Sequence, residues 1–234
     1  MNNPKFMNKY LILILIILTG CKEKKLKKSN EILIPPKILK QSQKSNLIKE
    51  KFLNDKNVIP FLNEYAKKNK ENKIKILTKY GEIEIKLYEE TKYHRANFIF
   101  LVKEKYFDNT LFHRVVKDFI IQGGNSDNPK ISTKRRRIGK YLLPPDTKKG
   151  FKHKRGTISM PSSEIENPHK LASPYEFFIV VAKNGAPHLN GNYTAFGEVT
   201  KGMDVADKIA NLKVDKREMP INNVFINIEI INNK

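Results

Sequence analysis

One segment of the chain reads Leu111-Phe112-His113-Arg114-Val115-Val116-Lys117-Asp118-Phe119-Ile120-Ile121-Gln122-Gly123-Gly124. Most of its side chains are apolar and favour strands, but a permanent cation, Arg114, and an amide, Gln122, stand among them. A half-buried guanidinium is costly unless its donors are used, and a glycine pair lets the backbone turn sharply or pass close to another group. The residues alone predict a β-hairpin of a barrel, in which Arg114 binds backbone carbonyls or serves a ligand.

The same segment resembles the signature of a known enzyme family. Phe112-His113-Arg114, then Phe119, then Gln122-Gly123-Gly124 is similar in order and spacing to the cyclophilin-type peptidyl-prolyl isomerases. Residues 155–160, 176–180 and 188–199 resemble further segments of that family. The resemblance implies a mainly β fold, a closed antiparallel eight-stranded barrel capped by two α-helices, formed by residues 73–234.

The hydrophobic pattern from residue 73 onward agrees with this order of elements. Apolar and polar residues alternate on both sides of Tyr80-Gly81, which predicts a hairpin. A helical period follows from Thr91 to Lys105, with Thr91 as a plausible N-cap. A second helix is expected over residues 202–209 and a last strand over residues 224–231.

The family resemblance also implies a set of site residues. Catalysis is assigned to Arg114, Phe119 and Gln122, with Arg114 donating to the proline nitrogen and Gln122 holding the substrate carbonyl. The substrate-binding residues that it implies are Ile120, Phe178, Leu189, Tyr193 and His113. For His113, a purely structural role is the alternative. The reaction needs no cofactor, and the histidines show no metal-ligand spacing.

Three features depart from the family pattern. Glu176 replaces the usual glutamine, and its carboxylate would weaken Arg114 for substrate if the two pair. Pro161 has no amide proton, so it removes one possible donor near the groove. The run from Lys130 to Lys140 is strongly basic and is expected to be a solvated loop. These departures favour an alternative function, a catalytically weak module that binds proline-containing segments.

The N-terminus predicts export and lipidation. A basic start and a short apolar run precede Leu18-Thr19-Gly20-Cys21, which resembles the bacterial lipoprotein box. Residues 1–20 are therefore predicted to be a signal peptide and Cys21 the lipidated residue. A buried cysteine in a membrane anchor is the alternative. The expected location is the bacterial cell envelope, with the domain outside the cytoplasm and attached to the membrane through Cys21.

Residues 21–72 are predicted to be a lysine-rich tether. From residue 22 they hold 14 Lys against six Asp or Glu, and a flexible chain of this length spans about 40 Å. Short helices are possible from Ser45 to Asn54 and from Pro60 to Lys68. We expect that residues 22–72 can be deleted without unfolding the domain. The alternative is that the short helices pack on the domain or on each other.

The formal net charge of the chain is +21. The sequence contains no recognisable nucleic-acid module, so we expect no nucleic-acid partner. The charge is attributed mainly to composition, with attraction to anionic polymers or lipid as a secondary effect. The expected partners are proline-containing polypeptides, and the chain is expected to be a monomer.

Overall fold

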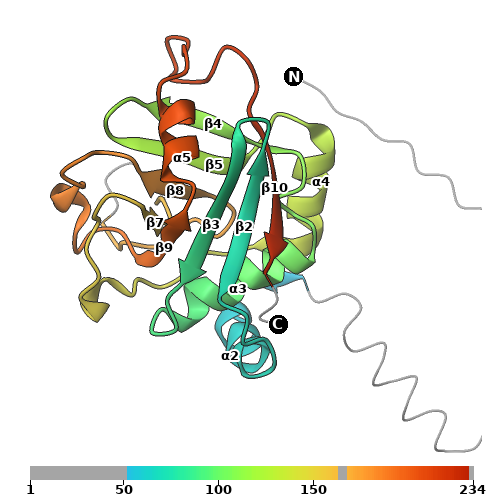
Figure 1. Cartoon of the computed structure of the whole chain (residues 1–234). Coiled ribbons are helices and arrows are strands. Elements are labelled where there is room, and N and C mark those ends of the chain that lie inside the picture. The colour runs from blue at the N-terminus through green and yellow to red at the C-terminus, as the bar shows by residue number, and fades with distance from the viewer. Residues whose placement is uncertain (1–51, 163–167, 232–234) are drawn as a thin grey trace, which may run out of the picture. The chain divides into compact units, whose positions relative to one another are not determined.

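The computed structural model describes residues 52–162 and 168–231. Eight antiparallel strands close into a barrel in the order β10-β2-β3-β9-β7-β8-β5-β4 (Figure 1). Their bounds are β2 Lys73–Thr78, β3 Gly81–Leu87, β4 Thr110–Val116, β5 Ile120–Asn125, β7 Thr157–Ser159, β8 Phe177–Val180, β9 Ala195–Lys201 and β10 Phe225–Ile230. The predicted eight-stranded barrel is therefore confirmed.

The barrel interior is filled by the alternate residues of its strands. In the β2–β3 hairpin, Ile74 pairs with Ile85 and Ile76 with Ile83, and all four side chains are buried. Their neighbours along each strand face outward, as the period of two requires, and apart from Leu77 they are polar. Phe98, from the helix that follows β3, packs against the rings of other core phenylalanines.

Two helices close the barrel, as the resemblance implied. α3 (Lys92–Lys103) lies at its lower end and α5 (Met203–Ala210) near its upper end in Figure 1. Thr91 precedes α3, but its hydroxyl makes no capping hydrogen bond. The short 3₁₀ segments η1 (Thr147–Lys149) and η2 (Pro187–Leu189) lie in the connections between strands.

Two further helices correct the predictions from sequence. α4 (Pro129–Ile138) occupies the basic run that was expected to be a loop. The side chain of Asn128 accepts a hydrogen bond from the Lys130 amide at 2.9 Å, and Pro129 occupies the first turn, an arrangement that favours a helix start. Ile131 is the one buried residue of α4, so the run is largely solvated but helical.

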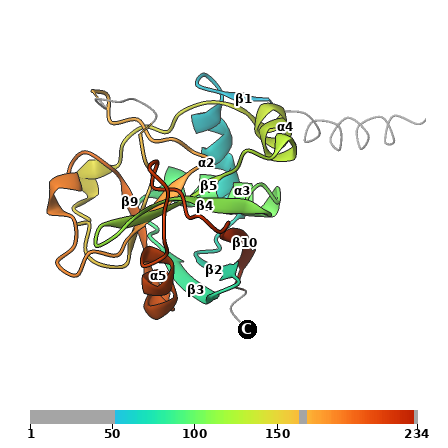
Figure 2. The same ribbon diagram turned by 90° about the horizontal axis from the view of Figure 1, so that it is seen from above.

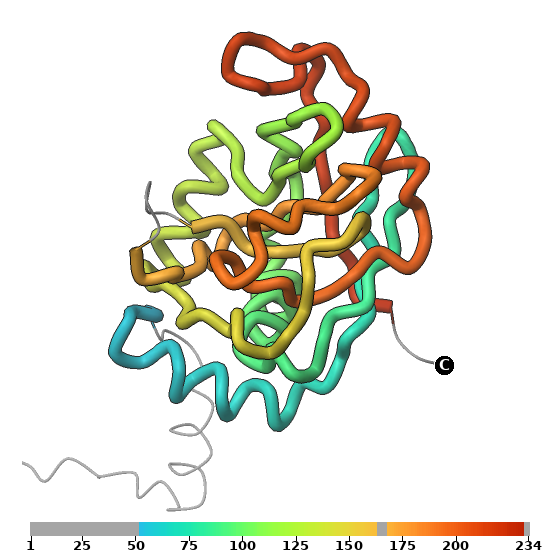
Figure 3. Tube along the Cα trace, turned by 90° about the vertical axis from the view of Figure 1, so that its left-hand side faces the viewer, coloured from blue at the N-terminus to red at the C-terminus, as the bar shows by residue number. Residues whose placement is uncertain are grey.

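The second addition is α2 (Val58–Lys68), which packs on α3. Val58, Leu62 and Ala66 are fully buried in the main core, and the blue segment runs along the green α3 in Figure 3. The expected helix from Pro60 to Lys68 is thus present and begins two residues earlier. Of the two alternatives for the tether, packing on the domain is correct for this part.

The residues before α2 form a short strand rather than the end of a helix. β1 (Leu53–Asn54) pairs in parallel with β6 (Gly139–Lys140) and Phe52 is not helical, so the predicted helix from Ser45 to Asn54 is wrong at its last three residues. Its remaining part, the signal peptide and Cys21 lie outside the described residues. Within the described ranges, no helix is long and apolar enough to span a membrane.

Candidate active site

The alternation of β5 and β8 separates the barrel core from an outer groove. Ile121 pairs with Ile179, and both belong to the barrel core. Ile120 pairs with Val180, and both belong to a second, smaller apolar cluster. Since successive residues of a strand face opposite sides, Gln122 shares the groove face with Ile120.

One row of side chains crosses four strands on this face. Arg114 on β4 pairs with Gln122 on β5, Gln122 pairs with Phe178 on β8, and Phe178 pairs with Ser159 on β7. Residues that are directly opposite in an antiparallel sheet project to the same side. The register therefore places a cation, an amide and an aromatic ring in line. We call the pair of Arg114 and Gln122 the polar row.

The apolar cluster lies beside this row. Its buried members are Ile120, Phe178, Val180, Ala186 and Leu189, and Val116, Phe119, Ala182 and Tyr193 pack against it. The Tyr193 ring is edge-on to Phe178, with their centroids 6.1 Å apart. The His188 ring lies 5.3 Å from that of Phe119. Such a cluster suits a proline ring, because it is apolar and reached from the surface.

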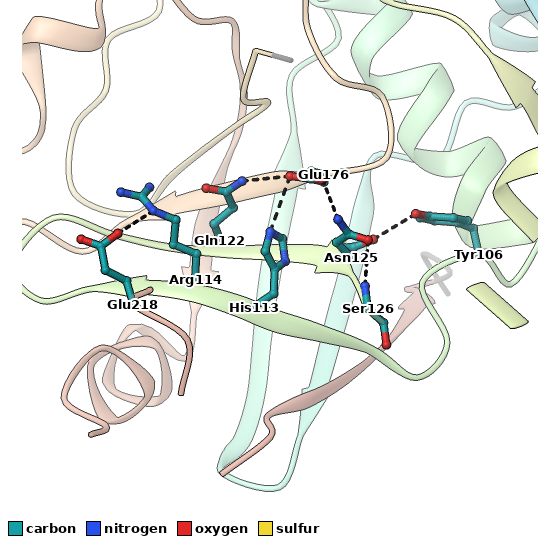
Figure 4. Close-up of polar contacts among 9 residues, drawn as sticks. Tyr106, His113, Arg114, Gln122, Asn125, Ser126, Glu176 and Glu218 are labelled. Atoms are coloured by element: carbon teal, nitrogen blue, oxygen red, sulfur yellow. Dashed lines mark hydrogen bonds and ion pairs between the residues drawn. The ribbon is translucent and has the colours of Figure 1, made fainter. Parts of the chain in front are cut away.

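A carboxylate from a distant loop holds Arg114. The Nε of Arg114 donates to Glu218 Oε2 at 2.7 Å. The backbone carbonyl of Glu218 also accepts from the Val115 amide at 2.7 Å, so the loop is fixed to β4 beside the arginine. Figure 4 shows this pairing at one end of the polar row. Among the described residues, Nε is the one guanidinium donor of Arg114 with a hydrogen-bond partner.

Glu176 binds the other end of the polar row. The Nε2 of Gln122 donates to Glu176 Oε2 at 2.9 Å and the Nδ2 of Asn125 to Oε1 at 3.1 Å. His113 Nε2 lies 3.5 Å from the same carboxylate. The prediction that Glu176 pairs with Arg114 is therefore wrong, because Glu218 is the partner of Arg114. In Figure 4 the Gln122 carbonyl oxygen lies on the Arg114 side of the amide.

The carboxyl group of Glu176 is held in its charged form. Burial alone raises its pKa, but hydrogen bonding and charge from His113, followed by the hydrogen bond from Gln122, outweigh the burial effect. The net pKa lies below the ordinary value of 4.5. An ionised carboxylate can only accept hydrogen bonds, so it fixes which end of the Gln122 amide faces Arg114.

The comparisons with known proteins agree with this geometry. The family described as cyclophilin type peptidyl-prolyl cis-trans isomerase/CLD matches residues 73–230. The chain belongs to this cyclophilin family. A peptidyl-prolyl cis-trans isomerase of Acinetobacter baylyi is 32% identical over 170 residues, which cover 68% of this chain and 86% of that protein.

Two further matches extend the comparison. The peptidyl-prolyl cis-trans isomerase-like 2 of Rhizopus delemar is 37% identical over 158 residues, which are 67% of this chain but 28% of that longer protein. A crystal structure of a Cryptosporidium parvum cyclophilin aligns with a TM-score of 0.58 and 29% identity, over 70% of this chain and 99% of the other. The activity common to these relatives is peptidyl-prolyl isomerisation, and this chain is an enzyme of that class.

The cyclophilin domain brings most of the predicted site residues together. Seven of the eight lie in the polar row or the apolar cluster, namely Arg114, Phe119, Ile120, Gln122, Phe178, Leu189 and Tyr193. The eighth, His113, lies against Glu176 instead, which fits the structural alternative. The described residues contain no group of three or more side chains suited to hold a metal ion.

Three contributors to the groove were missed from the sequence. Val180 was detectable, because it shares a strand face with Phe178. The His153 ring is stacked on that of Phe178, with their centroids 6.1 Å apart, and its Nε2 lies 3.1 Å from Ser159 Oγ. Burial lowers the pKa of His153, and this effect outweighs the hydrogen bond with Asn190. Glu218 is 104 positions from Arg114, and no local signal pointed to it.

Proposed function

We propose that this cyclophilin is a lipid-anchored prolyl isomerase that assists the folding of proteins in the bacterial cell envelope. The observation that carries the catalytic part is the register row in which Arg114, Gln122 and Phe178 stand side by side next to an apolar cluster. The row supplies a cation and the cluster supplies a ring-sized apolar surface. Proline-containing polypeptides are the substrates that this combination fits.

The reaction is rotation about an amide bond, so it needs no covalent intermediate, metal or cofactor. The barrier is high because the bond is partly double, roughly 20 kcal/mol. In the twisted state the proline nitrogen loses its resonance and becomes an acceptor. A donor aimed at that nitrogen stabilises the twisted state more than the planar states. A thousandfold to ten-thousandfold acceleration requires about 4–5.5 kcal/mol.

Arg114 is the donor in this proposal. Its guanidinium is permanently charged and holds its N–H groups in a rigid fork. Glu218 occupies Nε at the back of the fork, which leaves the two terminal nitrogens for substrate. Gln122 keeps one amide hydrogen for the substrate carbonyl while the other is bound by Glu176. Phe119, Ile120, Phe178, Leu189 and Tyr193 receive the ring.

The envelope part of the proposal rests on the sequence. Cys21 follows a short apolar run at the spacing of a lipoprotein box, and lipidation with more than one acyl chain gives stable membrane attachment. A folding enzyme held in this way would act on clients outside the cytoplasm. We propose that it works as a monomer, because the groove is completed by residues of a single chain.

The test is an isomerisation assay on the chain from residue 22 onward, which keeps every described residue. Exchange between the cis and trans forms of a short proline peptide is followed by NMR, with Arg114→Ala as the test variant and Arg137→Ala, an exposed cation of α4, as the control. We expect faster exchange with wild type and the control than with Arg114→Ala. A folded wild type that binds the peptide without accelerating exchange would establish the binding-module alternative.

A further inference from the structure

A cavity of about 740 Å³ opens beside α4, and its lining includes neither Arg114 nor Gln122. Its buried wall is apolar and includes Tyr141, Pro174 and Tyr175. Phe52 stands at its edge with 53% of its surface exposed. A phenylalanine with this exposure beside an apolar cavity marks a surface that is suited to a partner.

The rim of this cavity is strongly cationic. Arg135, Arg136 and Lys140 line it, and residues 128–140 hold six Lys or Arg and no Asp or Glu. The guanidinium of Arg135 lies over the Tyr175 ring, 4.7 Å from its centroid, and this contact holds the guanidinium at the mouth of the cavity. The acidic residue of the lining is Asp55, and its carboxylate accepts a hydrogen bond from the Leu142 amide at 2.9 Å.

We propose that this basic face, which comprises Arg135, Arg136, Lys140 and Phe52 around the cavity, docks on anionic phospholipid headgroups at the membrane surface. Guanidinium groups bind phosphate through paired hydrogen bonds, and each cation near an anionic membrane strengthens attachment. Phe52 supplies the apolar group that enters the interfacial region. The pairing of cations with an aromatic side chain matches the two parts of a phospholipid.

The position of this face in the chain favours a membrane over an acidic protein segment. The described structure begins on it, at Phe52, and 30 residues separate Phe52 from Cys21. Fully extended, they reach at most about 100 Å. A lipid on Cys21 would therefore keep this face at a high effective concentration near the bilayer. The inference rests on the proposed membrane anchorage for this step alone.

Docking here leaves the apolar cluster of the candidate active site accessible. Figures 1 and 2 both place α4 at one side of the molecule, and β9 with the orange loops before it towards the other. Leu189 and Tyr193 of the apolar cluster belong to those loops. A membrane contact through α4 would thus present the groove to clients.

The experiment uses the chain from residue 22 onward, without lipid, so that the face is measured apart from the anchor. Vesicles of phosphatidylcholine with about one third phosphatidylglycerol are compared with pure phosphatidylcholine vesicles in a sedimentation assay. The triple variant Arg135→Gln, Arg136→Gln, Lys140→Gln is expected to bind the anionic vesicles at least about tenfold more weakly than wild type. The control carries Lys86→Gln, Lys201→Gln and Lys208→Gln, three exposed cations on β3, β9 and α5, and has the same net charge.

A fluorescence reporter locates the contact. The sequence has no Trp, so Phe52→Trp introduces a single indole whose emission should shift to the blue with anionic vesicles. Phe225→Trp is the matched control, because Phe225 is 51% exposed on β10. Equal loss of binding in both triple variants, or no shift at position 52, would overturn the proposal.

A shift that a poly-glutamate peptide causes and anionic vesicles do not would assign the face to acidic protein segments and also overturn it. The two proposals fail separately. Lipidation of Cys21 is measured by mass spectrometry of the full chain. A lipidated chain whose basic face does not bind vesicles refutes the docking surface but not the anchor.

Discussion

The contact between Glu218 and Arg114 predicts that a residue outside the family signature controls the rate. The perturbation is Glu218→Ala, which removes the carboxylate that accepts from Arg114 Nε at 2.7 Å. Two effects oppose each other. Loss of the carboxylate frees a side chain that carries about 2 kcal/mol of rotamer entropy, and it also strengthens the positive potential at the terminal nitrogens.

Exposure decides which effect dominates. The side chains of Arg114 and Glu218 are 38% and 43% exposed, so water screens the charge effect, and pairs of this kind are worth about 0.2–1 kcal/mol. Water does not screen the ordering effect. We take roughly half of the 2 kcal/mol of rotamer entropy as the cost of ordering Arg114 again in the variant. We therefore expect Glu218→Ala to lower kcat/KM by about three- to tenfold, or roughly 0.7–1.4 kcal/mol.

The assay is the NMR exchange measurement with a proline peptide, and Glu218→Gln separates the two effects. Glutamine keeps an acceptor oxygen for Nε without the charge, so this variant should stay within about twofold of wild type. Glu229→Ala is the control, because Glu229 is an exposed carboxylate on β10. In an Arg114→Ala background the effect of Glu218→Ala should vanish. A Glu218→Ala enzyme as fast as wild type, or a Gln variant as slow as Ala, would refute the reasoning.

Four further predictions follow from the site, the packing and the sequence. Arg114→Ala should lower kcat/KM at least about tenfold and Arg114→Lys should restore little, because a point charge lacks the fork; the exchange assay measures both. Leu62→Ala should lower the free energy of unfolding by about 2–5 kcal/mol, since Leu62 is fully buried; urea unfolding tests this, and an unchanged midpoint would mean that α2 can be deleted. The pKa of Glu176 is lowered on folding, so the ionised carboxylate stabilises the fold above the pKa of the unfolded state, and this stabilisation is lost as pH falls through the pKa of the folded state. The free energy of unfolding of Glu176→Gln should therefore fall less than that of wild type between pH 5 and 3, as measured by urea unfolding. Cys21→Ser should abolish lipidation, and identical detergent partitioning of mutant and wild type would contradict it.

The closed barrel was predicted from the family resemblance, because its closure pairs strands far apart in the chain, such as β10 with β2, whereas the residues themselves predicted its local elements. Alternation on both sides of Tyr80-Gly81 sets the β2–β3 register, and the helical period after Thr91 gives α3. α2 also carried a usable signal, because Val58, Leu62 and Ala66 recur every four residues along one helical face. The sequence did not reveal that this face is buried by α3, since burial depends on a partner elsewhere in the chain.

The α4 helix was missed for a different reason. A run of like charges with only two apolar residues, Ile131 and Ile138, lacks the periodicity that indicates a packed helix. Its signal lies at the start instead, where Asn128 and Pro129 form an N-cap and first turn. The short pairing of β1 with β6 was also beyond sequence reasoning, because two residues on each strand leave no pattern to read.

The electrostatics of the site show where motif reasoning ends. Glu176 directly precedes β8, and the register of β8 on β5 places it beside Gln122 and Asn125 rather than beside Arg114. The glutamate at position 176, in place of the family's glutamine, therefore acts directly on the Gln122 amide. It affects Arg114 only through that amide. The carboxylate that touches Arg114 comes from the loop before β10, a segment with no family signature. If the rate of this enzyme differs from that of its relatives, Glu218 is a more direct cause than Glu176, because it contacts the donor itself.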